Sequence, residues 1–383
     1  MSDTGKSGAY DAALIGGGHN ALVCAFYLAR AGLKVRVCER RSVVGGAAVT
    51  EEFHPGFRNS VASYTVSLLN PAVIADMGLA GRGLRILKRP ISNFLPTEDG
   101  RYLKIGGGLE RTQAEFRKFS ARDAEALPHY YARLEKVADV LRALAGETPP
   151  NPRRGLTAGL ALARQGWPVA TAPLELQQDV LELFAKSARG FLDTFFDSAP
   201  VKAAFGFDAV VGNYASPDTP GSAYVLLHHV FGEVNGEKGA WGHAVGGMGA
   251  ITEAMRRACV EAGVEISTDA PVKEVLVDAG RAVGVVLENG EEVTARRVVS
   301  GVNPKLLYTK LTPSDALPPA FLRRMQGWAC GSGTFRMNVA LSELPDFACL
   351  PGREAGEHHR SGIVIAPSLA YMDRALIDAK LHG

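Results

Sequence analysis

The chain has 383 residues, of which 46% are hydrophobic and 21% are charged, and its formal net charge is +2. This length suits one large or two ordinary domains with a real apolar core. No basic stripe with interleaved aromatic residues suggests nucleic acid as a partner. The first eleven residues are polar and unlike a secretory signal, and no segment is long and apolar enough to span a bilayer. The composition therefore predicts a cytoplasmic globular protein.

The five cysteines are widely spaced and include no C-x-x-C pair. This spacing argues against a dithiol redox centre and against a zinc site, so we predict no metal. We expect all five to be small hydrophobic residues in a reducing compartment. They are Cys24, Cys38, Cys259, Cys330 and Cys349.

The segment from Ala12 to Glu39 has the pattern of a nucleotide-binding βαβ unit. An apolar strand, Ala12 to Ile15, leads into a G-x-G-x-x-A turn. Apolar residues at helical spacing follow and stop at Gly32, and Val35 to Val37 alternate into a second strand. Because strand, turn, helix and second strand occur in register, this pattern is more specific than a glycine-rich turn alone.

Each small residue of the turn has a structural role. Gly16 permits the tight turn, Gly18 lets the backbone approach a pyrophosphate, and Ala21 keeps the helix close to the sheet. The helix N-terminus offers free N–H groups to the phosphates. Glu39 lies near the spacing at which an acidic side chain hydrogen-bonds a ribose hydroxyl. The sequence therefore predicts a dinucleotide site; the alternative is an ordinary βα turn.

A second glycine pair, Gly45 and Gly46, bears on which dinucleotide binds. A VGG after the acidic residue resembles flavoproteins of the glutathione-reductase and amine-oxidase superfamily, which hold the ADP half of FAD here. The pair lets a second loop pass close over the pyrophosphate, and Arg40 or Arg41 can lie along the adenosine or the phosphates. A solvated basic turn is the alternative for the arginines. NAD in the same turn is disfavoured by the second glycine pair.

The middle of the chain has a different character. We expect a hairpin first and then a mostly helical insertion over roughly residues 110 to 240. The hairpin is predicted from Leu84 to Leu87 and Phe94 to Ile105, with a turn at Glu98-Asp99-Gly100, and the helices from Arg111 to Leu144, Leu156 to Val169 and Leu174 to Phe196.

Nucleotide-domain character returns at Gly246, which opens a helical pattern from Ala250 to Ala262. A strand and a β-meander are predicted to follow, over Val264 to Ser267, Val272 to Val277, Ala282 to Leu287 and Glu292 to Ser300. In flavoproteins of this class such a return crosses to the adenine of the same FAD. The backbone of Val272 would face it; the alternative is an ordinary buried valine.

Several longer stretches together resemble one family. They are GGGHNALVCAFYLARAGLKVRVCERRSVVGGAAVTEEFHPGFR, SPDTPGSAY from Ser216, WGHAVGGMGAITEAM, VVSGVNP from Val298, and GWAC with SGTFRMNVALSELPDF from Gly327 to Phe347. The chain resembles the phytoene-desaturase-like FAD oxidoreductases and, within them, the branch of the pyridine nucleotide-disulfide oxidoreductase domain-containing proteins. The resemblance covers nearly the whole chain.

The resemblance implies an α/β fold in which a Rossmann-like FAD/NAD(P)-binding domain is interrupted by a mixed substrate domain with a helical insertion. The FAD domain would comprise residues 1–70 and 241–304, and the substrate domain residues 71–240 and 305–383. Strands from Phe335 to Leu341 and Gly362 to Ala366 would carry a helix from Leu369 to Leu381. Relatives continue further and return to the flavin. We therefore expect an incomplete ring pocket, exposed apolar surface and weak FAD binding.

The family further implies FAD as cofactor and hydride exchange with a small, apolar substrate. Because the flavin carries such chemistry, no catalytic side chain is assigned. The candidates to face the ring are His228, His229 and His243 near Trp241, together with Arg58, Asn59 and Ser60 at a family position that approaches it. Ordinary structural histidines are the alternative. The alternative function is a flavin-fold binding or regulatory protein without turnover.

Peripheral membrane contact is a further expectation to weigh. Apolar substrates partition into lipid, and the stretch from Leu156 to Val169 is apolar with Arg153, Arg154 and Arg164 beside it. Small residues dominate the stretch, and only Trp167 is large enough to anchor. We therefore favour a core helix of the insertion over an interfacial helix.

Overall fold

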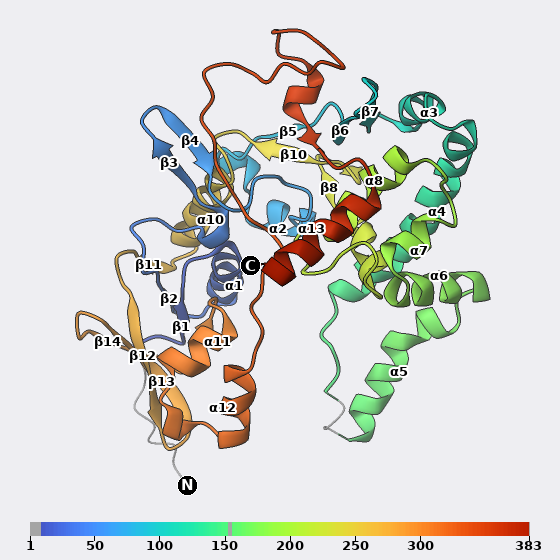
Figure 1. Ribbon diagram of the computed structural model, residues 1–383. Helices are drawn as coiled ribbons and strands as arrows, with labels where there is room; N and C mark the ends of the chain where they lie inside the picture. Colours follow the sequence, from blue (N-terminus) through green and yellow to red (C-terminus); the bar gives the residue numbers. More distant parts are fainter. Residues whose placement is uncertain (1–8, 152–154, 383) are drawn as a thin grey trace. The chain divides into compact units, whose positions relative to one another are not determined.

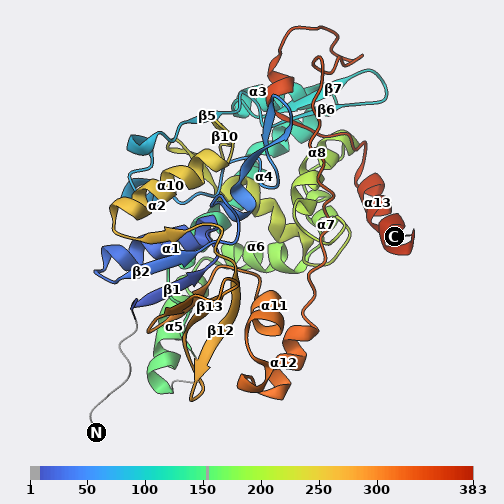
Figure 2. The same cartoon turned by 90° about the vertical axis from the view of Figure 1, so that its left-hand side faces the viewer.

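The computed structural model describes residues 9–151 and 155–382, and Figures 1 and 2 show it from two sides. The chain divides into two compact units. Unit 1 comprises Met1–Leu87 and Gly242–Cys330, and unit 2 comprises Lys88–Trp241 and Gly331–Gly383. These boundaries describe compactness, and the domain boundaries expected at residues 70, 240 and 304 stay predictions.

A parallel four-stranded sheet forms the centre of unit 1, in the order β11-β2-β1-β15. Its strands are β1 (Ala12–Ile15), β2 (Val35–Cys38), β11 (Glu265–Ser267) and β15 (Val298–Ser300). Helix α1 (His19–Arg30) connects β1 to β2, as the βαβ pattern predicts. The carboxyl ends of parallel strands are where such sheets bind ligands, and the glycine turn lies at that end of β1.

The two faces of this sheet are covered by different structures. Ala12 and Leu14 pack with residues of α1 and α10 (Gly249–Glu261), whereas Ala13 and Ile15 pack against the β-meander. Figure 2 shows the meander, β12 and β13, beside β1. Both faces of the sheet are therefore shielded from water. Because every side chain of such a strand is buried, the strands are short continuous apolar runs.

The predicted β-meander is confirmed as an antiparallel sheet of β12 (Val272–Asp278), β13 (Arg281–Leu287) and β14 (Glu292–Thr294). One strand was predicted wrongly, because Glu292 to Ser300 is two strands. The chain leaves the meander after β14 and enters the parallel sheet as β15, beside β1. Alternation alone does not reveal a change of sheet in mid-run.

Unit 2 is mainly helical, as predicted, with a three-stranded sheet in the order β16-β6-β7. The predicted hairpin is formed by β6 and β7, whereas residues 84–87 lead into β5 and pair elsewhere. The elements are β6 (Asn93–Pro96), β7 (Tyr102–Ile105), β16 (Gly362–Ile363), α3 (Leu109–Arg117), α4 (Ala121–Ala145), α5 (Leu156–Ala170), α6 (Leu174–Ala185), α7 (Ala188–Leu192), α8 (Ala199–Val210), α9 (His228–Phe231) and α13 (Leu369–His382).

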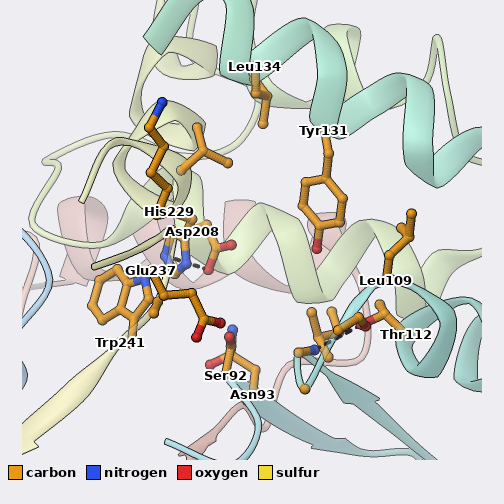
Figure 3. A pocket seen from close by; sticks show the side chains of 18 of the residues that line it. Ser92, Asn93, Leu109, Thr112, Tyr131, Leu134, Asp208, His229, Glu237 and Trp241 are labelled. Atoms are coloured by element: carbon orange, nitrogen blue, oxygen red, sulfur yellow. Dashed lines mark hydrogen bonds and ion pairs between the residues drawn. The ribbon is translucent and has the colours of Figure 1, made fainter. Parts of the chain in front are cut away.

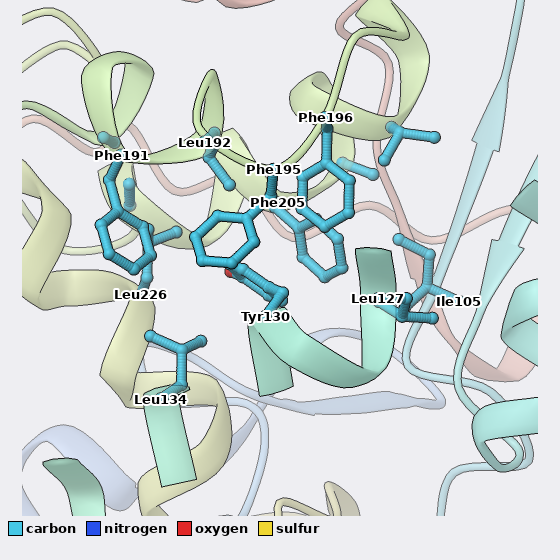
Figure 4. Close-up of a cluster of buried hydrophobic side chains, with 14 of the residues drawn as sticks. Ile105, Leu127, Tyr130, Leu134, Phe191, Leu192, Phe195, Phe196, Phe205 and Leu226 are labelled. Atoms are coloured by element: carbon cyan, nitrogen blue, oxygen red, sulfur yellow. The ribbon is translucent and has the colours of Figure 1, made fainter. Parts of the chain in front are cut away.

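The core of unit 2 is a cluster of aromatic side chains around Tyr130 of α4 (Figure 4). The Tyr130 ring lies 4.7 Å from that of Phe205 and 5.2 Å from that of Phe196, centroid to centroid. Offset and edge-to-face pairs of this kind stabilise beyond the area they bury. This core fixes α4 and α8, which carry the side chains of the cavity described below.

The remaining elements are short. They are β3 (Thr50–His54), β4 (Phe57–Ser60), β5 (Ile86–Lys88), β8 (Glu233–Val234), β9 (Glu237–Lys238), β10 (Gly242–Ala244), α2 (Pro71–Asp76), α11 (Pro304–Leu306), α12 (Pro319–Gln326), a π-helical turn at Leu307–Leu311, and 3₁₀ turns at Gly46–Ala48, Ala80–Arg82, Ser222–Leu227, Ser314–Ala316 and Glu357–Arg360.

Two predictions for unit 2 are wrong. The segment from Phe335 to Leu341 forms no strand, and the Phe335 side chain is 89% exposed, because no described neighbour supplies a ladder or covers a face. Helix α5 is not a core helix: Ala158 is the one buried side chain among those described, and Trp167 is 66% exposed. Membrane contact by α5 stays a prediction, and Arg153 and Arg154 lie outside the described residues.

Candidate functional site

The glycine turn and the second glycine pair meet at the carboxyl end of β1. Gly45 N–H donates to the Gly17 carbonyl at 2.9 Å, and Gly18 pairs with Gly45 as a parallel bridge. A Cβ on Gly46 would approach the Gly18 Cα to 3.1 Å, and Gly16 has a φ of +89°. These close backbone approaches require glycine.

The start of α1 is open to a ligand. Gly18 is its N-cap, and no side chain caps the helix. A helix begins with N–H groups that have no partner within the helix, and its dipole favours negative charge there. A Cβ on Gly18 itself would meet only the Gly46 Cα, at 3.9 Å, so the fold alone does not demand glycine there. The open space beside Gly18 is consistent with a pyrophosphate lying against it.

Glu39 is buried at the end of β2, with 6% of its surface exposed. Its carboxylate accepts hydrogen bonds from the Gly17 N–H at 2.6 Å and from the Arg41 N–H at 2.9 Å. A carboxylate has four lone-pair sites, so two remain for ribose hydroxyls. The structure thus places Glu39 directly under the turn that would hold the phosphates.

The other predicted contacts lie nearby along the chain. Arg40 is exposed and has no partner among the described residues, whereas Arg41 pairs with Glu51. Arg40 is therefore the arginine left for a cofactor. Val272 begins β12, two residues after Ala270, whose N–H donates to the Glu39 carbonyl at 2.9 Å. The structure brings Gly16, Gly18, Ala21, Glu39, Gly45 and Gly46 together and leads the Val272 segment to the same strand end.

His19, the first residue of α1, was not singled out from the sequence. Its Nδ1 is buried, and burial lowers the pKa of the imidazole, while an interaction with the Gly45 backbone partly opposes this. It is therefore neutral at pH 7 and offers an uncharged polar group beside the turn. A histidine at the first helical position after GGG was the available signal. The residues present thus fit the ADP half of FAD.

A cavity of about 540 Å³ adjoins the second glycine loop in unit 1. Val43, Val44, Thr252 and Arg256 are among the residues that line it. Arg58, a candidate from the sequence for approaching the flavin ring, also lines it, whereas none of the residues predicted to hold the ADP half does, and the Arg256 guanidinium is already held by Glu253 at 2.8 Å. This cavity therefore adds nothing to the assignment of the ADP half of the cofactor.

A larger cavity, of about 760 Å³, lies within unit 2 (Figure 3). Its walls come from the hairpin β6–β7, from α4, α8 and α9, and from the segment before Trp241. Leu109, Leu134 and Phe205 are among its apolar lining, and Tyr131 points its hydroxyl into the space. Its size is that of pockets that enclose a drug-sized ligand.

One wall of this unit 2 cavity carries a buried acid beside an imidazole. Asp208 Oδ1 lies 2.8 Å from His229 Nε2, and Asp208 is only 4% exposed. Burial raises the pKa of Asp208, while His229 and the Asn93 amide partly oppose this. Trp241 stacks on the His229 ring with centroids 4.6 Å apart. His229 was a candidate from the sequence, whereas Asp208 was missed because α8 brings it there from 21 residues earlier.

The other candidates from the sequence separate. His228 lies next to His229 in α9, where burial and then His229 lower its pKa to about 4. His243 belongs to unit 1, in β10, with its Nδ1 3.2 Å from the Tyr64 carbonyl. Ser60 accepts a hydrogen bond from the Met248 N–H at 2.9 Å. This contact gives Ser60 a structural role.

Other kinds of site are not evident in the part of the chain that is described. No group of three or more His, Cys, Asp or Glu side chains there could hold a metal ion. None of the described helices is long and apolar enough to cross a lipid bilayer. All five cysteines are unpaired.

Several known proteins are similar to this chain in sequence or in fold. Pyridine nucleotide-disulfide oxidoreductase domain-containing protein 2 of Mus musculus is 38% identical over 97% of this chain and 67% of its own length. One of the subunits of limonene dehydrogenase from Castellaniella defragrans is 28% identical, over 78% of this chain and 52% of its own. The crystal structure of an oxidoreductase from Methanosarcina mazei matches the fold with a TM-score of 0.54 at 15% identity, over 82% of this chain and 65% of its own.

The chain thus spans about two thirds of the length of the mouse relative. The sequence pattern of the flavin containing amine oxidoreductase family matches residues 22–334. This match confirms the predicted fold class, FAD as the cofactor of the class, and the enzyme class of FAD-dependent oxidoreductases. The chain belongs to the flavin containing amine oxidoreductase family.

Proposed function

We propose that this chain holds the ADP half of FAD in unit 1 and serves an oxidoreductase that exchanges hydride with an apolar small molecule. The observation that carries the proposal is the backbone bridge between Gly18 and Gly45, next to the buried Glu39 carboxylate that accepts from the turn. It supplies a phosphate approach and a ribose acceptor at one strand end. FAD, when bound, supplies the hydride acceptor, and the protein supplies binding and orientation.

Two observations support an apolar substrate. The unit 2 cavity has apolar and aromatic side chains in its lining, among them Ile105, Leu134 and Phe205, beside charged ones such as Lys88 and Glu237. A relative that is 28% identical is named for the dehydrogenation of limonene, a hydrocarbon. An apolar body in such a cavity gains about 25 cal/mol for each Å² removed from water. We therefore propose a desaturase-like or dehydrogenase-like reaction on a hydrophobic molecule.

Cofactor binding is tested with Gly18→Val. The side chain would occupy the phosphate approach, while its Cβ meets only the Gly46 Cα at 3.9 Å, so the fold should persist. We expect FAD affinity to fall at least about tenfold, a loss of about 1.4 kcal/mol, in a titration that follows flavin fluorescence. Gly81→Val is the matched control, because nothing lies within 4 Å of its Cβ position. Equal FAD affinity in both variants would refute the site.

Turnover is tested separately by anaerobic titration of the FAD-loaded protein with candidate reductants. We expect apolar reductants to bleach the oxidised flavin spectrum and air or a quinone to restore it. Retained FAD with no bleaching by any apolar or polar reductant would instead support a binding or regulatory protein.

A further inference from the structure

The wall of the unit 2 cavity contains polar atoms that the protein leaves unsatisfied. Asp208 Oδ1 lies 2.8 Å from His229 Nε2, yet the two atoms are not aligned as a hydrogen bond, and the Asn93 amide is the other group that interacts with the Asp208 carboxylate. The indole Nε1 of Trp241 is also buried without a described partner. All three residues line the same cavity.

Such atoms are costly to a fold. A buried polar group without a partner destabilises by about 1–3 kcal/mol, so natural proteins retain few of them. Here an acceptor, Asp208 Oδ1, and an N–H donor on Trp241 belong to residues that line the same cavity, and Figure 3 shows the Tyr131 hydroxyl pointing into that space. Burial raises the pKa of the Tyr131 phenol, so this hydroxyl stays protonated at neutral pH and can donate.

The chemistry of this wall selects among ligand groups. A hydroxyl donates one hydrogen bond and accepts two, which matches a carboxylate acceptor beside N–H and O–H donors. A carboxylate ligand would place a second negative charge against Asp208. Charged side chains elsewhere in the lining have ion pairs of their own, Lys88 with Glu237 at 2.6 Å, Lys238 with Glu135 at 3.5 Å and Arg111 with Glu357, so they do not call for a charged ligand.

The rest of the cavity suits an apolar skeleton. Leu109 and Leu134 line it away from Asp208 and Trp241, Phe205 is also part of the lining, and the volume is about 760 Å³. Apolar surfaces of this kind provide affinity, while a few placed polar groups fix the orientation.

We propose that the unit 2 cavity binds a neutral alcohol or phenol with an apolar body, whose hydroxyl donates to Asp208 and accepts from Tyr131. This inference rests on the proposed function and names the chemical class of its substrate, because the unit 2 cavity is the one that supports an apolar substrate there. All residues of the site belong to unit 2. Binding should therefore occur with or without FAD.

The test is calorimetric titration of the 383-residue protein with 2-naphthol and three analogues of the same skeleton: 2-methoxynaphthalene, naphthalene-2-carboxylate and 2-naphthylmethylamine. The methyl ether can accept but not donate, so it isolates the donation to Asp208. We expect 2-naphthol to bind at least about tenfold more tightly than each analogue. Equal or weaker binding of 2-naphthol would overturn the proposal.

Variants locate the site. Asp208→Asn and Tyr131→Phe should each weaken 2-naphthol about fivefold or more, while Asp193→Asn, which removes an exposed carboxylate paired with Lys202, should not. If Asp208→Asn fails to fold, Tyr131→Phe and the ether comparison still decide. FAD affinity, measured in parallel, should be unchanged in all three variants. Loss of FAD binding in Gly18→Val with naphthol binding intact would separate the two sites; naphthol binding that is unaffected by Tyr131→Phe would count against this one.

Discussion

The parallel sheet of unit 1 and the segment from Phe335 to Leu341 in unit 2 both have sequences typical of strands, continuously apolar in β1 and alternating in the segment. Only the first forms a strand. In β1, Ala12 and Leu14 face one covering layer while Ala13 and Ile15 face another, and all four are buried. In the segment, every second side chain is apolar and exposed: Phe335 by 89%, Met337 by 68%, Val339 by 57% and Leu341 by 54%.

The difference shows what a strand pattern needs to become a strand. Alternation makes one face apolar, but the backbone N–H and C=O groups require a neighbouring strand, and the apolar face requires a cover. Leu14 has both, through β2, β15 and helix α1. Around residues 335–341 the described chain provides neither. An exposed apolar patch of this kind favours association.

The largest expected effect compares Leu14→Ala with Phe335→Ala. Leu14 is 1% exposed, so its truncation should leave a cavity and lower the free energy of unfolding by about 2–5 kcal/mol. Phe335 is almost fully exposed, so its truncation should change that free energy by less than about 0.5 kcal/mol. Urea unfolding followed by circular dichroism measures both. A loss of similar size in the two variants would show that the segment is packed in solution.

The pH dependence of the unfolding free energy offers a second comparison, because the partly buried His228 lies in α9 of unit 2. Burial lowers the pKa of His228 from 6.5 to about 4. The unfolded chain therefore binds this proton first as the pH falls, so the stability it contributes is full above pH 6.5 and is lost toward pH 4. With allowance for partial exposure, the loss is about 2 kcal/mol.

The group is identified by mutation. His228→Gln should flatten the pH dependence of the unfolding free energy between pH 6.5 and 4, whereas His54→Gln, at an exposed site in unit 1, should leave it unchanged. The groups that face His228 are His229 and, through it, Asp208. If the pH dependence of the unfolding free energy is the same in His228→Gln as in the unchanged protein, the pH dependence belongs to His229 and Asp208 instead.

The smallest effect concerns the thiols. Burial raises the pKa of Cys38 in β2 to about 11 and that of Cys259 in α10 to about 12, whereas Cys330, at the start of the uncovered segment, is exposed. Because the thiolate is the reactive form, iodoacetamide should label Cys330 at least about tenfold faster than the other two. Mass spectrometry of the labelled peptides measures this. Cys330→Ser should leave FAD affinity within about twofold, and a larger loss would revive a role for that thiol.

The sequence by itself determined the nucleotide-binding unit. Ala12–Ile15, the glycine turn, α1 and Val35–Cys38 are contiguous, so local periodicity and glycine geometry were sufficient to place them. Glu39 followed from its spacing to the turn. The helical nature of unit 2 and the antiparallel β-meander were also predictable, since each depends on local pattern.

Only the tertiary structure decided which patterns find partners. It split Glu292 to Ser300 between two sheets, left Phe335 to Leu341 without a ladder, and exposed α5. It also brought Asp208 of α8 next to His229 of α9 on one wall of the unit 2 cavity. Pairing, covering and burial depend on residues far apart in the chain, and a single sequence contains no local signal for them.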